Sequence, residues 1–86
     1  MPPKKQFKNM TMRTKFQMYF VAAGYRTVPS RSSKYIVMSN GNQFIFLGAS
    51  GAVRVNHRNS AGGSQSYTPQ FKRVMEQWAI NQGYSL

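Results

Sequence analysis

Residues 32–57, SSKYIVMSNGNQFIFLGASGAVRVNH, contain lysine and arginine but no carboxylate. Lys34 and Arg54 lie within this segment, and Arg31 directly precedes it. Because a neutral protein surface intersperses both signs of charge, cations without acids indicate a surface that meets an anion. The chemistry that these residues predict is the binding of phosphate or carboxylate groups. The alternative is an ordinary solvated face, where cations keep the sheet soluble and its edges unpaired.

The charge of the whole chain is one-sided. Its 86 residues contain 12 lysines and arginines against a single acid, Glu76, and the formal net charge is +11. Such a chain repels itself unless a partner supplies negative charge. The expected partner is nucleic acid, either DNA or RNA, or else an acidic surface of another protein.

The scarcity of acids, histidine and cysteine excludes several kinds of active site. One Glu cannot form the carboxylate pair of a glycosidase or the carboxylate cluster of a two-metal nuclease. One His and no Cys leave no histidine-rich or thiolate metal centre. We therefore expect no enzymatic activity, no metal and no cofactor. The sequence shows no membrane-length apolar run and no secretion signal, and its lack of cysteine fits a reducing cytoplasm.

Apolar residues at helical spacing predict two helices. The first spans residues 11–23, with Asn9 or Thr11 as its cap and Gly24 at its end. Its apolar stripe comprises Met12, Phe16, Tyr19, Phe20 and Ala23. The second begins at Thr68-Pro69, a cap followed by proline at the first helical position, and ends at Gly83. Its stripe comprises Phe71, Val74, Met75, Trp78 and Ala79.

The segments outside the helices predict an arm, a connection and three antiparallel strands. Residues 1–8 hold two prolines and three lysines and indicate a basic flexible arm. Residues 24–33 form a connection in which proline stops a helix. The Asn-Gly pair at residues 40–41 favours a two-residue type I′ hairpin turn, and GASG at residues 48–51 makes a second turn.

These turns assign the strand residues to two faces, because directly opposed residues share a face. One face is apolar throughout and is expected to be the core under both helices: Tyr35, Val37, Phe44, Phe46, Val53 and Val55. The other face is mixed and carries Lys34 and Arg54. The aromatic residues of the apolar face are also typical of a platform on which single-stranded bases stack, but its valines favour a core.

We therefore expect a single α+β domain over residues 9–86, in the order α-β-β-β-α, with both helices packed on one face of a three-stranded antiparallel sheet. Cations are expected to contact the nucleic-acid backbone from the arm, both helices and the sheet. These residues are Lys4, Lys5, Lys8, Arg13, Lys15, Arg31, Lys34, Arg54, Arg58, Lys72 and Arg73. The last two stand near a helix N-terminus, which itself favours anions, although two solvated surface cations would look the same.

Two catalytic or phosphate-binding alternatives are weaker. His57 with Arg58 could act as a general acid or base, but a lone histidine at a strand end is usually a polar turn residue. The segment SAGGS at residues 60–64 lacks the P-loop pattern, so it is better explained as a plain loop.

The order of elements resembles double-stranded-RNA-binding domains and the HicA-type ribonuclease toxins, over residues 12–56. Those toxins end their first helix with glycine and an aromatic residue, and a Gly-Ser-His follows at the start of a strand. Here Gly24-Tyr25 is followed by Arg31, Ser32, Ser33 and Lys34. The catalytic histidine would fall at Lys34 or Tyr35, and a lysine with a pKa near 10.4 is a poor general base at neutral pH. The resemblance implies a binding scaffold that has lost cleavage, with residual ribonuclease activity as a third option.

A second resemblance is to small basic proteins encoded by tailed phages, over residues 30–66. These proteins share a Ser/Lys-Tyr-Ile-Val strand, an aromatic strand ending in glycine, and a Gly-Ala-aliphatic-Arg strand. The matching segments here are residues 33–37, 44–48 and 51–54. The likeness implies a product that acts in the cytoplasm of an infected bacterium.

Together these observations predict a non-enzymatic phage protein that contacts the nucleic-acid backbone through basic residues with little base readout. The alternative is a phage-encoded inhibitor that docks on an acidic surface of a host polymerase, nuclease or defence system. No membrane partner is expected, and the oligomeric state stays open.

Overall fold

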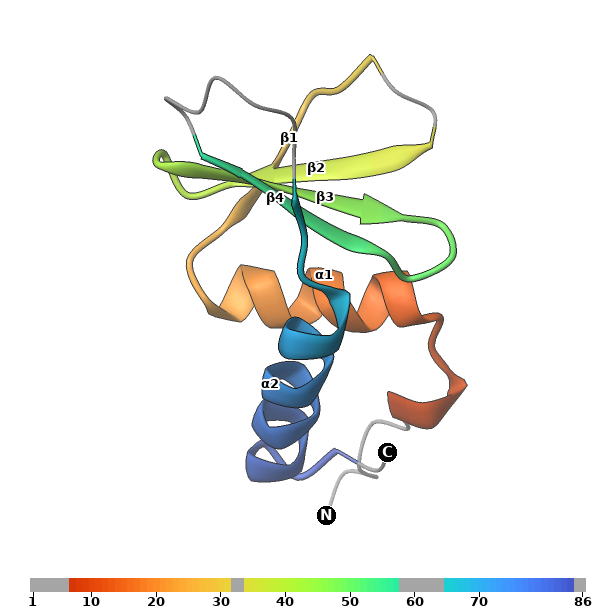
Figure 1. Cartoon of the computed structure of the whole chain (residues 1–86). Coiled ribbons are helices and arrows are strands. Elements are labelled where there is room, and N and C mark those ends of the chain that lie inside the picture. Colours follow the sequence, from red (N-terminus) through yellow and green to blue (C-terminus); the bar gives the residue numbers. More distant parts are fainter. Residues whose placement is uncertain (1–6, 32–33, 58–64, 85–86) are drawn as a thin grey trace.

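The chain folds into one antiparallel sheet with two helices on one side. The computed structural model describes residues 7–31, 34–57 and 65–84. Its elements in chain order are the 3₁₀ turn η1 (Phe7–Asn9), the helix α1 (Met12–Ala22), the strands β1 (Arg26–Val28), β2 (Tyr35–Ser39), β3 (Gln43–Gly48), β4 (Val53–His57) and β5 (Gln65–Ser66), and the helix α2 (Thr68–Asn81). Helix α1 lies beneath the strands, whereas α2 starts near the sheet and leads away from it (Figure 1).

The α+β class and the two helices are as predicted, but the predicted three strands are a correction. In the described residues the sheet has five strands in the order β1-β2-β3-β4-β5, and each neighbouring pair is antiparallel. The two additional strands lie at the edges and contain only three and two residues. Strands this short show no periodicity, and β1 ends directly before the proline that led us to expect a connection.

Helix α1 begins and ends as its sequence predicts. Thr11 is the N-cap, and its Oγ1 accepts a hydrogen bond from the backbone N–H of Thr14 at 3.2 Å. At the other end Gly24 has a φ of +96°, which suits glycine because it lacks a Cβ. The N–H of Tyr25 donates to the carbonyl of Phe20 at 2.9 Å and closes the helix.

Helix α2 ends at a glycine as predicted, but its first residues play a different part. The N-cap is Tyr67, and no side chain caps the helix there. Thr68 instead accepts a hydrogen bond at its Oγ1 from the backbone N–H of Val53, at 2.9 Å. Thr68 therefore fastens the start of α2 to β4, and Pro69 still stands within the first turn.

The β2–β3 turn gives a register two residues away from the predicted one. Gly41 has a φ of +98° but Asn40 has no positive φ, so the type I′ turn is not formed. The Asn40 Oδ1 accepts hydrogen bonds from the backbone N–H groups of the second and third following residues, both at 2.9 Å, and supports a wider loop. Val37 consequently pairs with Phe46, whereas the predicted two-residue turn would pair it with Phe44. A shift of two residues keeps every side chain on its face.

The β3–β4 turn is one residue away from prediction, and this difference exchanges the faces of β4. The N–H of Gly48 donates to the carbonyl of Ala52 at 2.9 Å across a three-residue loop that ends on Gly51, whose φ is +91°. Phe46 therefore lies opposite Arg54, whereas a two-residue turn within GASG would set it opposite Val53. Since side chains alternate along a strand, the valines of β4 lie on the other face of the sheet.

The core lies between the helices and the aliphatic face of the sheet. Its most buried members are Phe16, Phe20, Met38, Ile45, Leu47, Val53, Val55, Met75 and Ala79. The predicted helical stripes are corrected at two positions: Val74 is 50% exposed and Ala23 is exposed. Trp78 is only partly buried, although it packs against the core.

The N-terminal turn η1 contributes a core residue that the sequence analysis placed in the basic arm. Phe7 is 0% exposed. Its ring stacks on Tyr84 with centroids 5.1 Å apart, and it meets Trp78 edge-on at 6.3 Å. The Nζ of Lys15 lies 5.3 Å from the centroid of the same ring, within cation–π range. Residues 1–6 of the predicted arm lie outside the described residues.

Candidate nucleic-acid interface

The face of the sheet that points away from the helices, here called the outer face, gathers aromatic and cationic side chains. Strand pairing aligns its residues in three rows across the sheet. The first row is Arg26, Ser39, Phe44 and Asn56, the second is Val28, Val37, Phe46, Arg54 and Ser66, and the third is Tyr35 and Gly48.

The three aromatic residues of the outer face are a correction to the predicted core. Tyr35, Phe44 and Phe46 are each partly buried, and none of them packs against the buried cluster beneath the sheet. The rings of Tyr35 and Phe46 contact each other edge to face, with centroids 6.3 Å apart and planes at 87°. The error comes from the register of β4. The prediction placed Val53 and Val55 on the same face as these rings, whereas the observed pairing places Arg54 there.

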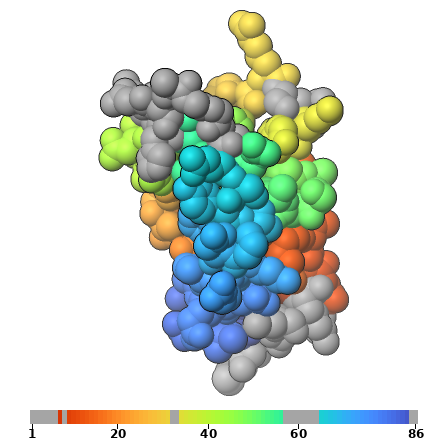
Figure 2. Space-filling model, in the orientation of Figure 1, coloured from red at the N-terminus to blue at the C-terminus, as the bar shows by residue number. Residues whose placement is uncertain are grey.

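Three of the predicted contact residues accompany these rings. Arg54 lies directly opposite Phe46 in the second row. Arg31 and Lys34 are exposed, and they flank the end of the connection between β1 and β2. The stretch that leaves β1 rises on the side of the sheet away from the helices (Figure 1), and side chains of the yellow region stand out at that end of the molecule (Figure 2).

Arg26 is a fourth cation of the outer face, and the sequence analysis did not propose it as a contact residue. It is exposed on β1 and lies opposite Ser39. It was missed because the segment around it was assigned to a connection. The available signal was local: β-branched Thr27 and Val28 follow it directly, and such residues favour strands.

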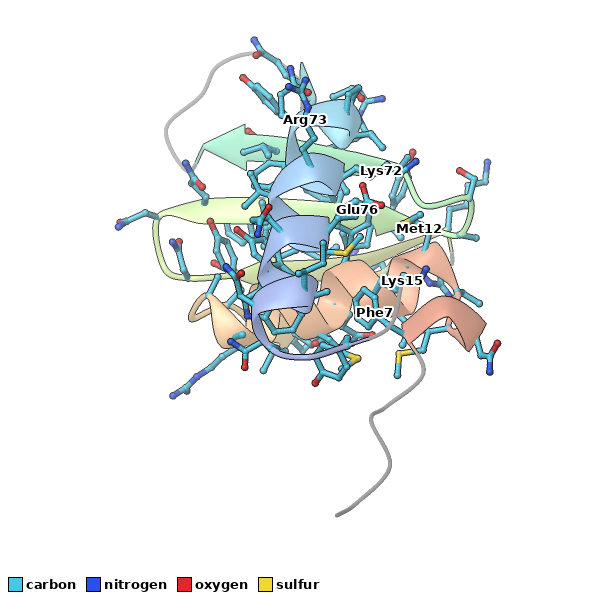
Figure 3. The ribbon with its side chains drawn as sticks, turned by 90° about the horizontal axis from the view of Figure 1, so that it is seen from below. Phe7, Met12, Lys15, Lys72, Arg73 and Glu76 are labelled. Carbon is cyan, nitrogen blue, oxygen red and sulfur yellow. The ribbon has the colours of Figure 1, made fainter. Side chains whose placement is uncertain are left out.

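The other described cations lie on the helices and belong to a different part of the surface. Arg13 and Lys15 are on α1, and Lys72 and Arg73 are near the start of α2 (Figure 3). The only acid of the chain, Glu76, follows Lys72 by four residues and therefore shares its side of α2. The outer face thus contains no carboxylate side chain, whereas Lys72 has one on its side of α2.

Several predicted residues cannot be assigned to either group. Lys4, Lys5 and Arg58 lie outside the described residues, and the side chains of Lys8 and His57 are not described. Their contact with nucleic acid remains a prediction, as does a catalytic role for His57.

Two shallow hollows open near opposite ends of β2. The first has a volume of about 460 Å³ and is lined by Lys34, Tyr35, Gly48, Ala49, Ser50 and Ala52. The second has a volume of about 470 Å³ and is lined by Gly24, Arg26, Val28, Ser39, Asn40 and Gly41. Each hollow combines one cation with residues of the outer face. This size lies within the range of small-molecule sites.

Tyr25 supports the sheet from the helical side. Its phenol donates a hydrogen bond to the Oε1 of Gln43 at 2.8 Å, and its ring packs edge-on against Phe20 at 5.2 Å. Burial, with a smaller contribution from neighbouring Tyr19, raises the pKa of Tyr25 above its ordinary value. The group therefore stays neutral at physiological pH and joins β3 to the segment before β1.

Neither a metal site nor a relative points to a function. In the part of the chain that the structure describes, no three His, Cys, Asp or Glu residues lie close enough to hold a metal ion. None of the helices described there has the length and apolar character needed to cross a membrane. No protein-family model, curated protein or solved structure matches the chain. The functional conclusion accordingly rests on the outer face.

Proposed function

We propose that this protein is a non-enzymatic nucleic-acid-binding protein that holds a phosphate backbone against the outer face of its sheet. The observation that carries the proposal is the group of cations at this face, on a side of the molecule without a carboxylate side chain. These cations are Arg26, Arg31, Lys34 and Arg54. Lysine and arginine contact phosphates regardless of sequence, so binding to many sequences is expected.

The spread of the cations favours a polyanion over a small anion. Arg26 and Lys34 line hollows near opposite ends of β2. At about 3.3 Å per residue, the four steps along β2 between these hollows cover about 13 Å. One small anion reaches one of these cations, whereas a chain of phosphates reaches both. The single Glu and single His of the sequence leave few groups for acid–base catalysis, which supports a binding role.

A salt titration tests the proposal. Fluorescence anisotropy with labelled oligonucleotides measures the binding constant at several salt concentrations. If four cations contact phosphates, log K falls against log salt with a slope near −3 for single strands and near −4 for duplex DNA. A parent protein without salt-dependent binding to any oligonucleotide would rule the proposal out.

Two double variants with the same loss of charge locate the site. Arg26→Gln with Arg54→Gln should weaken binding roughly tenfold and reduce the salt slope by between one and two units, because each substitution removes a phosphate contact. The matched control, Arg13→Gln with Lys72→Gln, should change both quantities much less. Equal effects of the two pairs would show that binding follows net charge and not the outer face.

An acidic protein surface is the outcome that would replace this proposal. The same cations could dock on a host polymerase, nuclease or defence protein, as an inhibitor encoded by a phage would do. A pull-down from bacterial lysate, with and without nuclease, separates the two. A single protein partner that is retained after nuclease treatment, together with weak oligonucleotide binding, would favour the inhibitor.

A further inference from the structure

The aromatic residues of the outer face offer more than a backbone site needs. Backbone binding requires cations alone, yet Tyr35, Phe44 and Phe46 lie among the cations and outside the core. Partly buried aromatic residues beside cations, on the sheet face that points away from the helices, are typical of recognition surfaces. Unpaired bases present flat faces that stack on aromatic side chains, and in a nucleic acid they accompany the phosphates.

The hollow at Tyr35 places an aromatic ring beside a cation, the two groups that a base and a phosphate would contact. Gly48 is one of its lining residues, and a Cβ added there would lie 3.5 Å from Cε1 of Tyr35 and 3.4 Å from Cβ of Ala52. The ring of Tyr35 therefore lies in van der Waals range of the position that a Cβ of Gly48 would occupy, and Tyr35 also lines the hollow. Lys34 lines the same hollow, so a cation and an aromatic ring are adjacent there.

The remaining aromatic residues continue from this hollow along the outer face. Gly48, Phe46 and Phe44 are successive outer-face positions of β3 and are spaced by about 7 Å. Phe46 contacts Tyr35 edge to face, and Arg54 lies opposite Phe46. The second hollow, with Arg26, lies at the far end of β2. Rings and cations thus occur together over the whole length of β2.

We infer that the outer face binds single-stranded nucleic acid along β2, with one unpaired base stacked on Tyr35 in the hollow that Lys34 borders. The inference rests on the proposed function, since the four cations supply the backbone contacts. A duplex presents its phosphates but keeps its bases paired and stacked, so it cannot use the rings. RNA and DNA single strands share the recognised chemistry, which is a base with a flexible phosphate backbone.

Binding of matched oligonucleotides tests this inference. The probes are a labelled ten-nucleotide single-stranded RNA, the DNA strand of the same sequence, and the corresponding duplexes, all at one salt concentration. The parent protein should bind at least one single strand more tightly than either duplex. Tighter binding of RNA or of DNA identifies the preferred sugar and supports the inference in both cases. Equal or tighter binding of a duplex would overturn it.

Variants of Tyr35 separate stacking from charge. Tyr35→Leu should weaken single-strand binding by about 5- to 150-fold, the range expected for loss of one base–aromatic stack, and leave the salt slope unchanged. Tyr35→Phe keeps the ring and should bind as the parent does. Circular dichroism and thermal melting verify that both variants are folded. A folded Tyr35→Leu protein with parental single-strand affinity would overturn the inference.

Photocrosslinking identifies which residues contact the bases and does not rely on a comparison of affinities. A single strand carrying 5-iodouracil at each position in turn should crosslink to Tyr35 or Phe46, as identified by mass spectrometry. Crosslinks confined to α1 and α2 would overturn the inference even if binding is salt-dependent. That combination would leave nucleic-acid binding intact but move it off the sheet. A parent protein that binds no probe at any salt concentration would instead overturn the proposed function itself.

Discussion

Adjacent residues of β3 give the sharpest test of which face of the sheet is buried. Leu47 is 0% exposed in the core, whereas Phe46 is partly buried on the outer face. Leu47→Ala removes buried methyl groups and leaves a cavity, so it should lower the free energy of unfolding by about 2 to 5 kcal/mol. Phe46→Ala removes a larger side chain but mainly loses an edge contact with Tyr35, and it should cost only about 1 to 2 kcal/mol.

Urea unfolding followed by circular dichroism measures both values against the parent. For a domain of this size, each kcal/mol corresponds to roughly 4 to 8 °C in Tm, so the two variants should melt at clearly different temperatures. Their effects on binding should run in the opposite order: Phe46→Ala weakens single-strand binding, and folded Leu47→Ala retains it. A greater loss of stability for Phe46→Ala would restore the originally predicted faces and remove the basis of the outer-face proposals.

Three further predictions concern the N-terminal turn, a glycine and a tyrosine. Phe7→Ala should cost about 3 to 5 kcal/mol in urea unfolding because the ring is fully buried, and Phe7→Leu should cost less; an unchanged midpoint for Phe7→Ala would contradict its place in the core. Gly51→Ala should lower the free energy of unfolding by about 1 to 3 kcal/mol, and by more than Gly41→Ala. Both glycines have a positive φ, but only at Gly51 would the new Cβ lie 2.7 Å from Cγ of Met12. Equal losses of stability in the two variants would refute this close approach. Folding raises the pKa of Tyr25, so its contribution to stability is fully present below the unfolded pKa near 10 and is lost as the pH rises through the folded pKa. Between pH 8 and 11 the free energy of unfolding should therefore decline less steeply for Tyr25→Phe than for the parent. An identical decline in both proteins would show that Tyr25 does not cause it.

The helices were largely predictable from the sequence because their signals are local. Thr11, Gly24 and Gly83 act within a few residues of their own position, and each stands where the sequence analysis expected it. The apolar spacing identified Phe16, Phe20, Met75 and Ala79 as core residues for the same reason. The predicted role of Thr68 as the cap of α2 was wrong, because its Oγ1 accepts a hydrogen bond from Val53, a residue 15 positions away.

Which face of the sheet is buried was harder to predict, because the answer changes when the β3–β4 loop is longer or shorter by one residue. Both readings of the β3–β4 turn place a glycine at a plausible position, and they differ only in whether the loop has two or three residues between paired positions. That difference decides whether the valines of β4 join the aromatic or the aliphatic residues of β3. The sequence analysis therefore assigned the aromatic residues Tyr35, Phe44 and Phe46 to the core, and the structure places them in the candidate site.

The cations show the same limit. Lys34 and Arg54 were identified by the lack of acids around them, which composition reveals. Arg26 was not, because its position on the outer face depends on pairing with Ser39, 13 residues later. A prediction from the sequence can count charges reliably, but only strand pairing tells which of them share a surface.

The stack of Phe7 on Tyr84 joins residues that are 77 positions apart in a chain of 86. Closing so long a loop carries a large entropic cost, so this contact is expected to form after the hairpins, whose partners are near in sequence. The contact between the two ends of the chain, here called the terminal seam, is correspondingly expected to open before the whole protein unfolds. Amide hydrogen exchange would detect this opening as early exchange in η1 and in the last turn of α2. The strands pair independently of the terminal seam, so their amides would stay protected from exchange during such openings. The protein can then loosen at its ends while its outer face stays ordered.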